Sequence, residues 1–181
     1  MFGGQWDHIQ SGGELMIIRA EAIKMADSIR DNVNTDVIIA GKYTKTLNKE
    51  DLAKHVLEDL DPALGKQLPG RLLVAGTNFG SGSSREQAPI ALKSAGCQGV
   101  IASSFARIFF RNAINIGLPL IETDIDEVAD GDLLCVDLSS GQLRNETRGQ
   151  SIAITPLPEI MMNIFISGGL VPYLREKGSF Q

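Results

Sequence analysis

Short apolar runs alternate with helical segments through the middle of the chain. Residues 71–76 ("RLLVAG"), 98–105 ("QGVIASSF") and 118–122 ("LPLIE") are typical of buried strands. Residues 87–96 and 107–117 are predicted helices, and each of them ends at a glycine. A strand–helix–strand–helix–strand order predicts a parallel sheet in which the helices form the crossover connections.

Flanking segments add further elements to this core. The predicted elements are a strand at 17–25, a polar turn running into a short strand at 32–43, a helix at 48–60, a hairpin at 132–146 that turns at 139–141, a strand at 151–157 and a helix at 158–168. We therefore expect an α/β fold with a parallel βαβαβ core and additional antiparallel strands.

The length and composition indicate one globular domain. At 181 residues the chain can bury a sizeable core. Residues 1–15 are rich in glycine and lack periodicity, so we interpret them as a mobile N-terminal extension and residues 16–181 as the domain. The chain shows no signal peptide, and no apolar run approaches the roughly 18 residues of a membrane span, so we expect a cytoplasmic protein without membrane contact.

The charge and the metal-ligating residues exclude several classes of function. The net charge is −5 and no block of Lys or Arg stands out, which argues against nucleic-acid binding. The only cysteines are Cys97 and Cys135, and the only histidines are His8 and His55. An iron–sulfur cluster needs about three or four cysteine ligands, so we expect this chain to hold no cluster or other metal alone.

The most polar segment, "GTNFGSGSSREQAP" at 76–89, has two interpretations. The first is an ordinary helix start, because Ser83 and Glu86 form the S-x-x-E pattern of a capping box. In that register Pro89 would be the sixth helical residue, which costs about 3 kcal/mol. We therefore expect the helix to begin near Glu86. Residues 78–85 are then irregular backbone at the carboxyl end of a parallel strand, where ligands bind in such sheets.

The second interpretation is an anion-binding catalytic loop. The guanidinium of Arg85 offers a bidentate fork to a carboxylate, and a helix amino terminus adds a positive partial charge. Positive surroundings also lower the cost of a serine alkoxide, so Ser83 could take a proton. A dinucleotide fingerprint fails because Arg85 stands where its third glycine would be, and the P-loop and serine-hydrolase patterns are absent. We favour the catalytic interpretation.

Three motifs in order carry a family resemblance. "NTDVI" at 34–38, "GSGSSRE" at 80–86 and "SFARIFFRNAINIGLP" at 104–119 resemble the small subunits of the aconitase-like hydro-lyases, above all those of isopropylmalate dehydratases. The resemblance runs from about residue 16 to residue 178. It implies a swivelling β/β/α domain that closes over a large subunit carrying a [4Fe–4S] cluster. The implied reaction moves a hydroxyl between neighbouring carbons of a hydroxy-dicarboxylate or tricarboxylate by removing and re-adding water.

The resemblance also implies roles for individual residues. Ser83 matches the serine that takes the carbon-bound proton, and Asp36 with its neighbour Thr35 matches an active-site aspartate near that serine. Arg85 matches the arginine that grips a substrate carboxylate, and Ser84 matches a neighbour that hydrogen-bonds the same group. On the residues alone, Thr35 and Asp36 indicate only a turn.

Substrate choice stays open at this stage. Tyr43, Lys45 and Thr46 lie in "YTKT", the stretch that forms a substrate-selecting loop in the family. An apolar loop suits 3-isopropylmalate, the leucine-biosynthesis substrate, and a cation suits the extra carboxylate of homoaconitate. Lys45 could reach such a carboxylate or point into water. The alternatives are therefore a homoaconitase or dimethylmalate-type dehydratase small subunit, or a binding module of the same fold without catalysis.

The resemblance has departures and further implications. Relatives often carry cysteine at the position of Ser81 and histidine at that of Gln87. Arg107, Arg111 and Asn112 are expected to support the structure or face the large subunit rather than touch substrate. The isolated chain is expected to be inactive without its large subunit, and self-association of the isolated chain is a further possibility.

Overall fold

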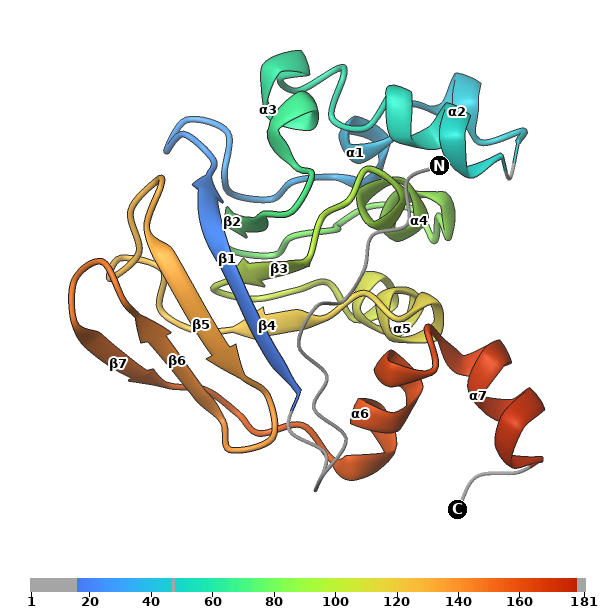
Figure 1. The fold of residues 1–181 in the computed structure, drawn as a ribbon. Coiled ribbons are helices and arrows are strands. Elements are labelled where there is room, and N and C mark those ends of the chain that lie inside the picture. The colour runs from blue at the N-terminus through green and yellow to red at the C-terminus, as the bar shows by residue number, and fades with distance from the viewer. Residues whose placement is uncertain (1–15, 47, 179–181) are drawn as a thin grey trace.

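The structure is a computed structural model that describes residues 16–46 and 48–178. Within them, one sheet is built in the order β4-β3-β2-β1-β5-β6-β7 (Figure 1). The strands are β1 (Ile17–Lys24), β2 (Leu72–Ala75), β3 (Gly99–Ala102), β4 (Leu120–Glu122), β5 (Leu133–Asp137), β6 (Gln142–Asn145) and β7 (Gln150–Ala153). Strands β1 to β4 pair in parallel, and β5 to β7 continue the sheet with antiparallel pairing. The predicted parallel core with antiparallel additions is confirmed.

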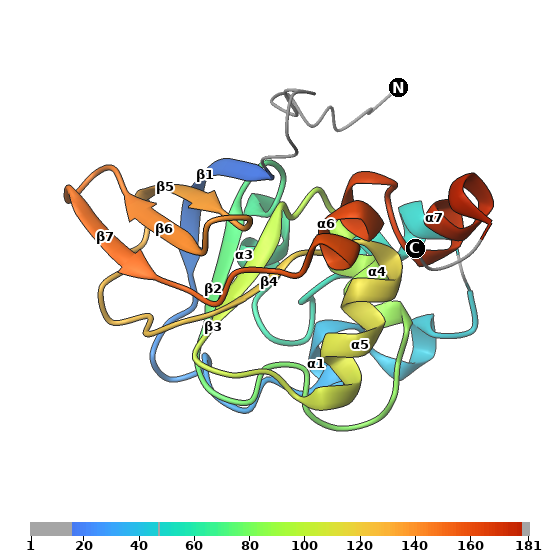
Figure 2. The same ribbon diagram turned by 90° about the horizontal axis from the view of Figure 1, so that it is seen from below.

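The helices lie mostly beside the parallel half of the sheet, and β5 to β7 turn away from it on the other side (Figures 1 and 2). The helices are α1 (Thr35–Ile38), α2 (Lys49–Lys54), α3 (Pro62–Gln67), α4 (Gln87–Ser94), α5 (Arg107–Ile116), α6 (Glu159–Ile166) and α7 (Leu170–Lys177), with a 3-10 turn η1 at Gly41–Tyr43. The order β2-α4-β3-α5-β4 matches the predicted one. Along the described part of the chain, no helix has the length and apolar character needed to cross a membrane.

Two layers of apolar side chains hold the parallel strands. Strands β2 and β3 are buried at every position because both faces of the sheet are covered. On β2, Leu73 packs into the cluster formed with α1 to α5, and Leu72 packs into the cluster formed with β5, β6 and α6. The strand ends therefore have little freedom, and the loops that leave them start from fixed points.

The prediction for residues 32–43 was wrong. This segment forms α1 and η1 instead of a strand, because the side chain of Asn34 accepts a hydrogen bond from the amide of Asp36 (2.9 Å) and caps a helical turn. Ile38 and Ile39 then point into the core with no exposed surface. An apolar run of this length cannot be assigned to a strand or a helix by periodicity.

The helix predicted at 48–60 is shorter than expected. Helix α2 ends at Lys54, and Leu57 adopts a left-handed backbone conformation (φ 57°). Leu57 is nevertheless buried, and its amide donates to the carbonyl of Ile38 (2.8 Å). Helices α3 and α7 carried no prediction, and the extension at 1–15 lies outside the described residues.

At Gly80 the loop after β2 packs closely against helix α5. The φ of Gly80 is +79°, and a Cβ built on it would lie 2.1 Å from Cγ of Phe109. Phe79 next to it is fully buried and packs edge-on against Phe109. The loop can approach α5 this closely only because residue 80 lacks a side chain.

Gly80→Ala is expected to destabilise the protein more than Gly131→Ala. Both glycines have a positive φ (79° and 78°), but a Cβ on Gly131 meets no atom within 4 Å. The left-handed conformation costs alanine about 1–2 kcal/mol at either site, and overpacking adds about 1–3 kcal/mol at Gly80. Urea unfolding of the two variants measures the difference, and equal losses would contradict the contact with Phe109.

Candidate functional site

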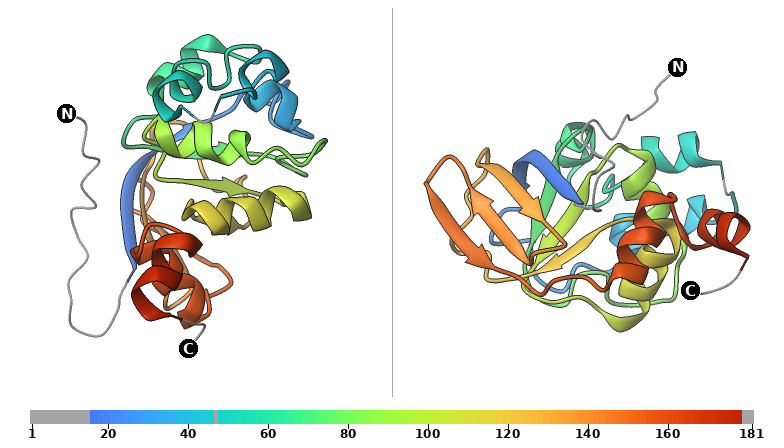
Figure 3. Two further views of the ribbon diagram at one scale, coloured as in Figure 1. Left: turned by 90° about the vertical axis from the view of Figure 1, so that its right-hand side faces the viewer. Right: turned by 60° about the horizontal axis from the view of Figure 1, so that its bottom comes forward.

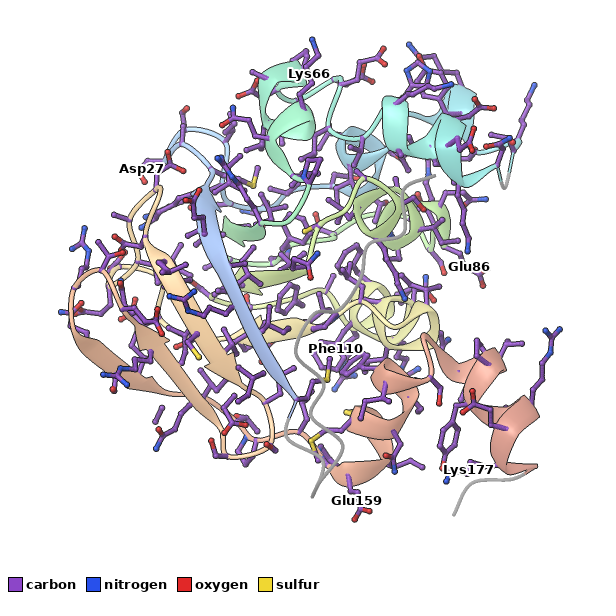
Figure 4. The ribbon with its side chains drawn as sticks, in the orientation of Figure 1. Asp27, Lys66, Glu86, Phe110, Glu159 and Lys177 are labelled. Atoms are coloured by element: carbon purple, nitrogen blue, oxygen red, sulfur yellow. The ribbon has the colours of Figure 1, made fainter. Side chains whose placement is uncertain are left out.

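The loop between β2 and α4 carries the candidate site. Helix α4 begins at Gln87 with Glu86 as its N-cap residue, and residues 78–85 are outside any helix or named strand, as predicted. Glu86 makes no side-chain capping bond, and the hydroxyl of Ser83 contacts Arg85 and Asp36 instead of the helix start. The capping-box interpretation is therefore wrong. Figure 4 shows Glu86 at the molecular surface beside α4.

Backbone hydrogen bonds fasten this loop to the start of α1. The amides of Gly80 and Ser81 donate to the carbonyl of Val33 (2.8 and 3.1 Å), and the amide of Thr35 donates to the carbonyl of Ser81 (2.8 Å). The hydroxyl of Thr35, which is 2% exposed, donates to the carbonyl of Ser83 (3.0 Å). In the left view of Figure 3 the green loop before α4 lies between α1 and the start of α5. Two motifs far apart in the sequence thus form one surface.

Three polar side chains converge on this surface. The Nε of Arg85 donates to the Oγ of Ser83 (3.0 Å), and its Nη2 lies 2.5 Å from the Oδ1 of Asp36. A longer hydrogen bond runs from the Oγ of Ser83 to the same carboxylate oxygen (3.4 Å). Asp36 is 52% exposed and Arg85 24% exposed, so the group faces solvent. Ser84 beside it is also exposed.

This arrangement suits proton transfer beside a bound carboxylate. The Arg85 guanidinium next to the oxygen of Ser83 favours its alkoxide form by charge and hydrogen bonding. Asp36 occupies one side of the same guanidinium, so an incoming carboxylate would share or replace that pairing. The guanidinium is held at its other edge by the carbonyl of Ile39, which accepts from Nη1 (3.4 Å).

The predicted substrate-selecting loop lies beside the three side chains. A Cβ on Gly41 would be 3.3 Å from Nη1 of Arg85, and the Nε2 of Gln87 donates to the carbonyl of Thr44 (3.1 Å). Lys45 is exposed and makes no ion pair with any described residue. The hydroxyl of Thr46 accepts from the amide of Asn48 (3.0 Å), within its own turn.

Tyr43 contacts a different set of side chains from Ser83, Arg85 and Asp36. Its ring stacks on His55 with 3.8 Å between centroids and 8° between planes, and its hydroxyl contacts Glu58. Sequence reasoning found no partner for His55 and did not single out Glu58. It also missed Asn34, although an asparagine before a short apolar run is a common helix cap and could have indicated α1.

The described residues do not form a metal centre. No three His, Cys, Asp or Glu side chains in this part of the chain lie close enough together to hold a metal ion. Burial raises the pKa of the Cys97 thiol to about 11, so this sulfur is a protonated core group at neutral pH. The donor set of the described chain does not fit an iron–sulfur cluster.

The comparisons with known proteins agree with this architecture. The family model described as the aconitase C-terminal domain matches residues 65–124. A 3-isopropylmalate dehydratase small subunit from Nautilia profundicola is 51% identical over 148 residues, covering 81% of this chain and 89% of the relative. A methanogen homoaconitase small subunit from Methanothermobacter thermautotrophicus is 53% identical over 142 residues, covering 78% of this chain and 83% of the relative.

A solved structure extends the likeness to the fold. The crystal structure of 3-isopropylmalate dehydratase from Methanocaldococcus jannaschii has a TM-score of 0.82 and 42% identity, and covers 90% of this chain and 96% of that one. The domain is therefore of the aconitase type. The chain belongs to the family of dehydratase small subunits that includes those of 3-isopropylmalate dehydratase and homoaconitase.

Thr35→Val is expected to lower the free energy of unfolding by about 1 kcal/mol, because it removes the buried hydrogen bond to the Ser83 carbonyl at little change of volume. The matched control is Thr123→Val, since the Thr123 hydroxyl makes no hydrogen bond to a described residue and sits at a partly buried site. Chemical denaturation measures both. If the two variants lose the same stability, the Thr35 hydroxyl does not fasten the loop.

Proposed function

We propose that the chain is the small subunit of a two-subunit hydro-lyase that isomerises a hydroxy-dicarboxylate by dehydration and rehydration, with 3-isopropylmalate as the substrate. The names of its relatives support this, as does one observation in the structure. Ser83, Arg85 and Asp36 meet at the surface, where a substrate held by a second protein can reach them. The occurrence of Ser83, Arg85 and Asp36 together favours catalysis over a binding module of the same fold.

Each of these residues has a role in the proposed reaction. Arg85 binds the carboxylate of the substrate that is farthest from the departing hydroxyl. Ser83 reacts as an alkoxide that Arg85 stabilises, its own hydroxyl proton having passed to solvent. It takes the proton from the neighbouring carbon and becomes a hydroxyl, and this hydroxyl returns the proton to carbon in the rehydration step. Asp36 accepts the hydrogen bond of the Ser83 hydroxyl and orients its oxygen. Ser84 donates a hydrogen bond to the same substrate carboxylate as Arg85. Thr35 supports the loop backbone through its hydrogen bond to the Ser83 carbonyl.

The remainder of the active site is assigned to a large subunit. Because the described donor set of this chain does not fit a cluster, we infer that the partner holds the [4Fe–4S] cluster. Such a cluster supplies Lewis-acid chemistry toward a hydroxyl and a carboxylate. The residues of this chain contribute the proton-accepting group, the carboxylate clamp and a surface that excludes water when the subunits close.

A homoaconitase small subunit is the alternative. The 53% identity to the methanogen homoaconitase subunit favours it, as does the exposed cation of Lys45 on the loop beside Arg85. Homoaconitate carries one more carboxylate than 3-isopropylmalate, and a flexible ammonium can reach it. The two substrates differ at the group that this loop would meet.

Reconstitution with the large subunit of the same organism tests the function. We expect the complex to turn over 3-isopropylmalate and the isolated chain to be inactive. Ser83→Ala should lower kcat by at least about 100-fold, as loss of a general base does, while the chain still folds and pairs. The control is Ser151→Ala at an exposed position on β7. Turnover by the chain without a partner, or a wild-type kcat in Ser83→Ala, would refute the proposal.

A second experiment addresses the substrate. Lys45→Val in the reconstituted complex is expected to raise the KM for homoaconitate about tenfold, the size of one charge-assisted contact, and to leave the KM for 3-isopropylmalate unchanged. Lys49→Val, at another exposed lysine nearby, serves as the control. An unchanged KM for homoaconitate would show that the ammonium of Lys45 does not meet the substrate.

A further inference from the structure

Building on the function proposed above, we propose that His55 and Glu58 are positioning residues. Acting through Tyr43, they hold residues 41–46 as a fixed wall of the site formed by Ser83, Arg85 and Asp36. They thereby set how tightly the substrate is bound. Neither residue contacts those three side chains, so the effect is on the wall and not on the proton transfer.

The inner side of the wall touches the site directly. Gly41 lies so close to Arg85 that an added Cβ would come within 3.3 Å of Nη1 and 3.5 Å of Nη2. The side chain of Gln87, at the start of α4, donates to the carbonyl of Thr44 (3.1 Å). A shift of this wall would therefore change the space around the guanidinium that binds the carboxylate.

The outer side of the wall is held by a cluster of four side chains. The Tyr43 ring stacks flat on His55 (3.8 Å between centroids), and its hydroxyl donates to Oε1 of Glu58 (3.2 Å). The Nδ1 of His55 contacts Oε2 of the same carboxylate. Lys42 completes the cluster, with its Nζ 4.8 Å from the centre of the Tyr43 ring and 3.5 Å from Oε1 of Glu58.

This cluster is a polar clamp at the margin of the hydrophobic core, against which Tyr43 also packs. His55 is 33% exposed and Glu58 36% exposed, so their contacts are not imposed by close packing. Hydrogen bonds from His55 first, and then from Tyr43, hold the pKa of the Glu58 carboxyl below its usual range. The carboxylate is therefore ionised at neutral pH. The aromatic stack, the hydroxyl bond and the cation over the ring all converge on Tyr43.

The backbone beneath the clamp is anchored to the same segment that carries Asp36. The amide of Leu57, between the two clamp residues, donates to the carbonyl of Ile38 at the end of α1 (2.8 Å). Leu57 itself has a left-handed backbone conformation (φ 57°). The wall is thus bounded by α4 on one side and by the segment 55–58 on the other.

Loosening the clamp should weaken substrate binding and spare the chemical step. With Tyr43 released, residues 41–46 must become ordered each time a substrate binds, and that ordering cost appears as weaker binding. The contacts among Ser83, Arg85 and Asp36 do not involve the clamp. A rise in KM with an unchanged kcat is therefore the signature of the proposed role.

The test is steady-state kinetics of the complex reconstituted with its large subunit, using 3-isopropylmalate. His55→Ala is expected to raise KM about three- to tenfold, the size of one aromatic pair, with kcat within about twofold of wild type. His55→Phe keeps a flat ring beneath Tyr43 and should restore most of the affinity. Glu58→Ala should raise KM as His55→Ala does, and Glu58→Gln, which keeps an acceptor for the Tyr43 hydroxyl, should restore part of it.

The matched control is Lys54→Ala, at the residue directly before His55. It removes an exposed ion pair with Asp51 and should change neither KM nor kcat. Hydrogen exchange of the isolated chain gives a readout without turnover. The amides of Tyr43, Thr44 and Thr46 should exchange faster in His55→Ala than in wild type or Lys54→Ala, since they close the turns of the wall.

The outcomes separate this inference from the proposed function. If the wild-type complex fails to turn over 3-isopropylmalate, the proposed function fails. The hydrogen-exchange rates of the isolated chain then test by themselves whether His55 holds residues 41–46. Unchanged exchange in His55→Ala overturns the inference. So does a fall in kcat that matches the rise in KM, or a failure of His55→Phe to recover affinity, because either would indicate a general loss of structure.

Discussion

The site depends on the backbone pairing between residues 33–35 and residues 80–81. These hydrogen bonds are made by groups that every residue possesses, so they fix the positions of Asp36 and Ser83 irrespective of side-chain rotamers. The buried hydroxyl of Thr35 adds a contact to the Ser83 carbonyl. If these segments separated, the guanidinium of Arg85 would keep Ser83, which lies in its own loop, but would lose its aspartate partner. The side-chain chemistry is therefore secondary to a main-chain constraint.

The parallel sheet explains why such pairing occurs at this place. Loops that follow β1 and β2 leave from the same edge because the strands are parallel neighbours. Apolar side chains cover both faces of β2 and both faces of the end of β1 at Ala22 and Ile23. Gly80 lets the second loop approach α5, and Asn34 turns the first loop into α1. The edge of a rigid sheet thus carries two irregular segments whose relative position varies little.

The sequence predicted those parts of the fold and site that depend on interactions between residues close together in the chain. The elements between residues 71 and 122 were predicted because buried strands and helices have distinct local patterns. The start of α4 was also predicted, because Pro89 is tolerated only in the first turn of a helix and so excludes a start at Ser83. Helix α1 was missed, since four residues show no period and the cap of Asn34 competes with the strand propensity of "VII". The clamp on Tyr43 was missed because its partners His55 and Glu58 lie 12 and 15 residues further along the chain, beyond the range of local patterns.

The exposure of the site has its own physical consequence. In contact with water, the attraction between the Arg85 guanidinium and a serine alkoxide is weakened by a high dielectric constant. The same pair shielded by a second protein surface interacts several times more strongly, and the hydration of Asp36 would be lost as well. A carboxylate that reached the guanidinium would share or replace its pairing with Asp36. Half-exposed side chains that already contact one another are thus suited to be activated by closure, because the geometry is preformed and only the solvent has to leave.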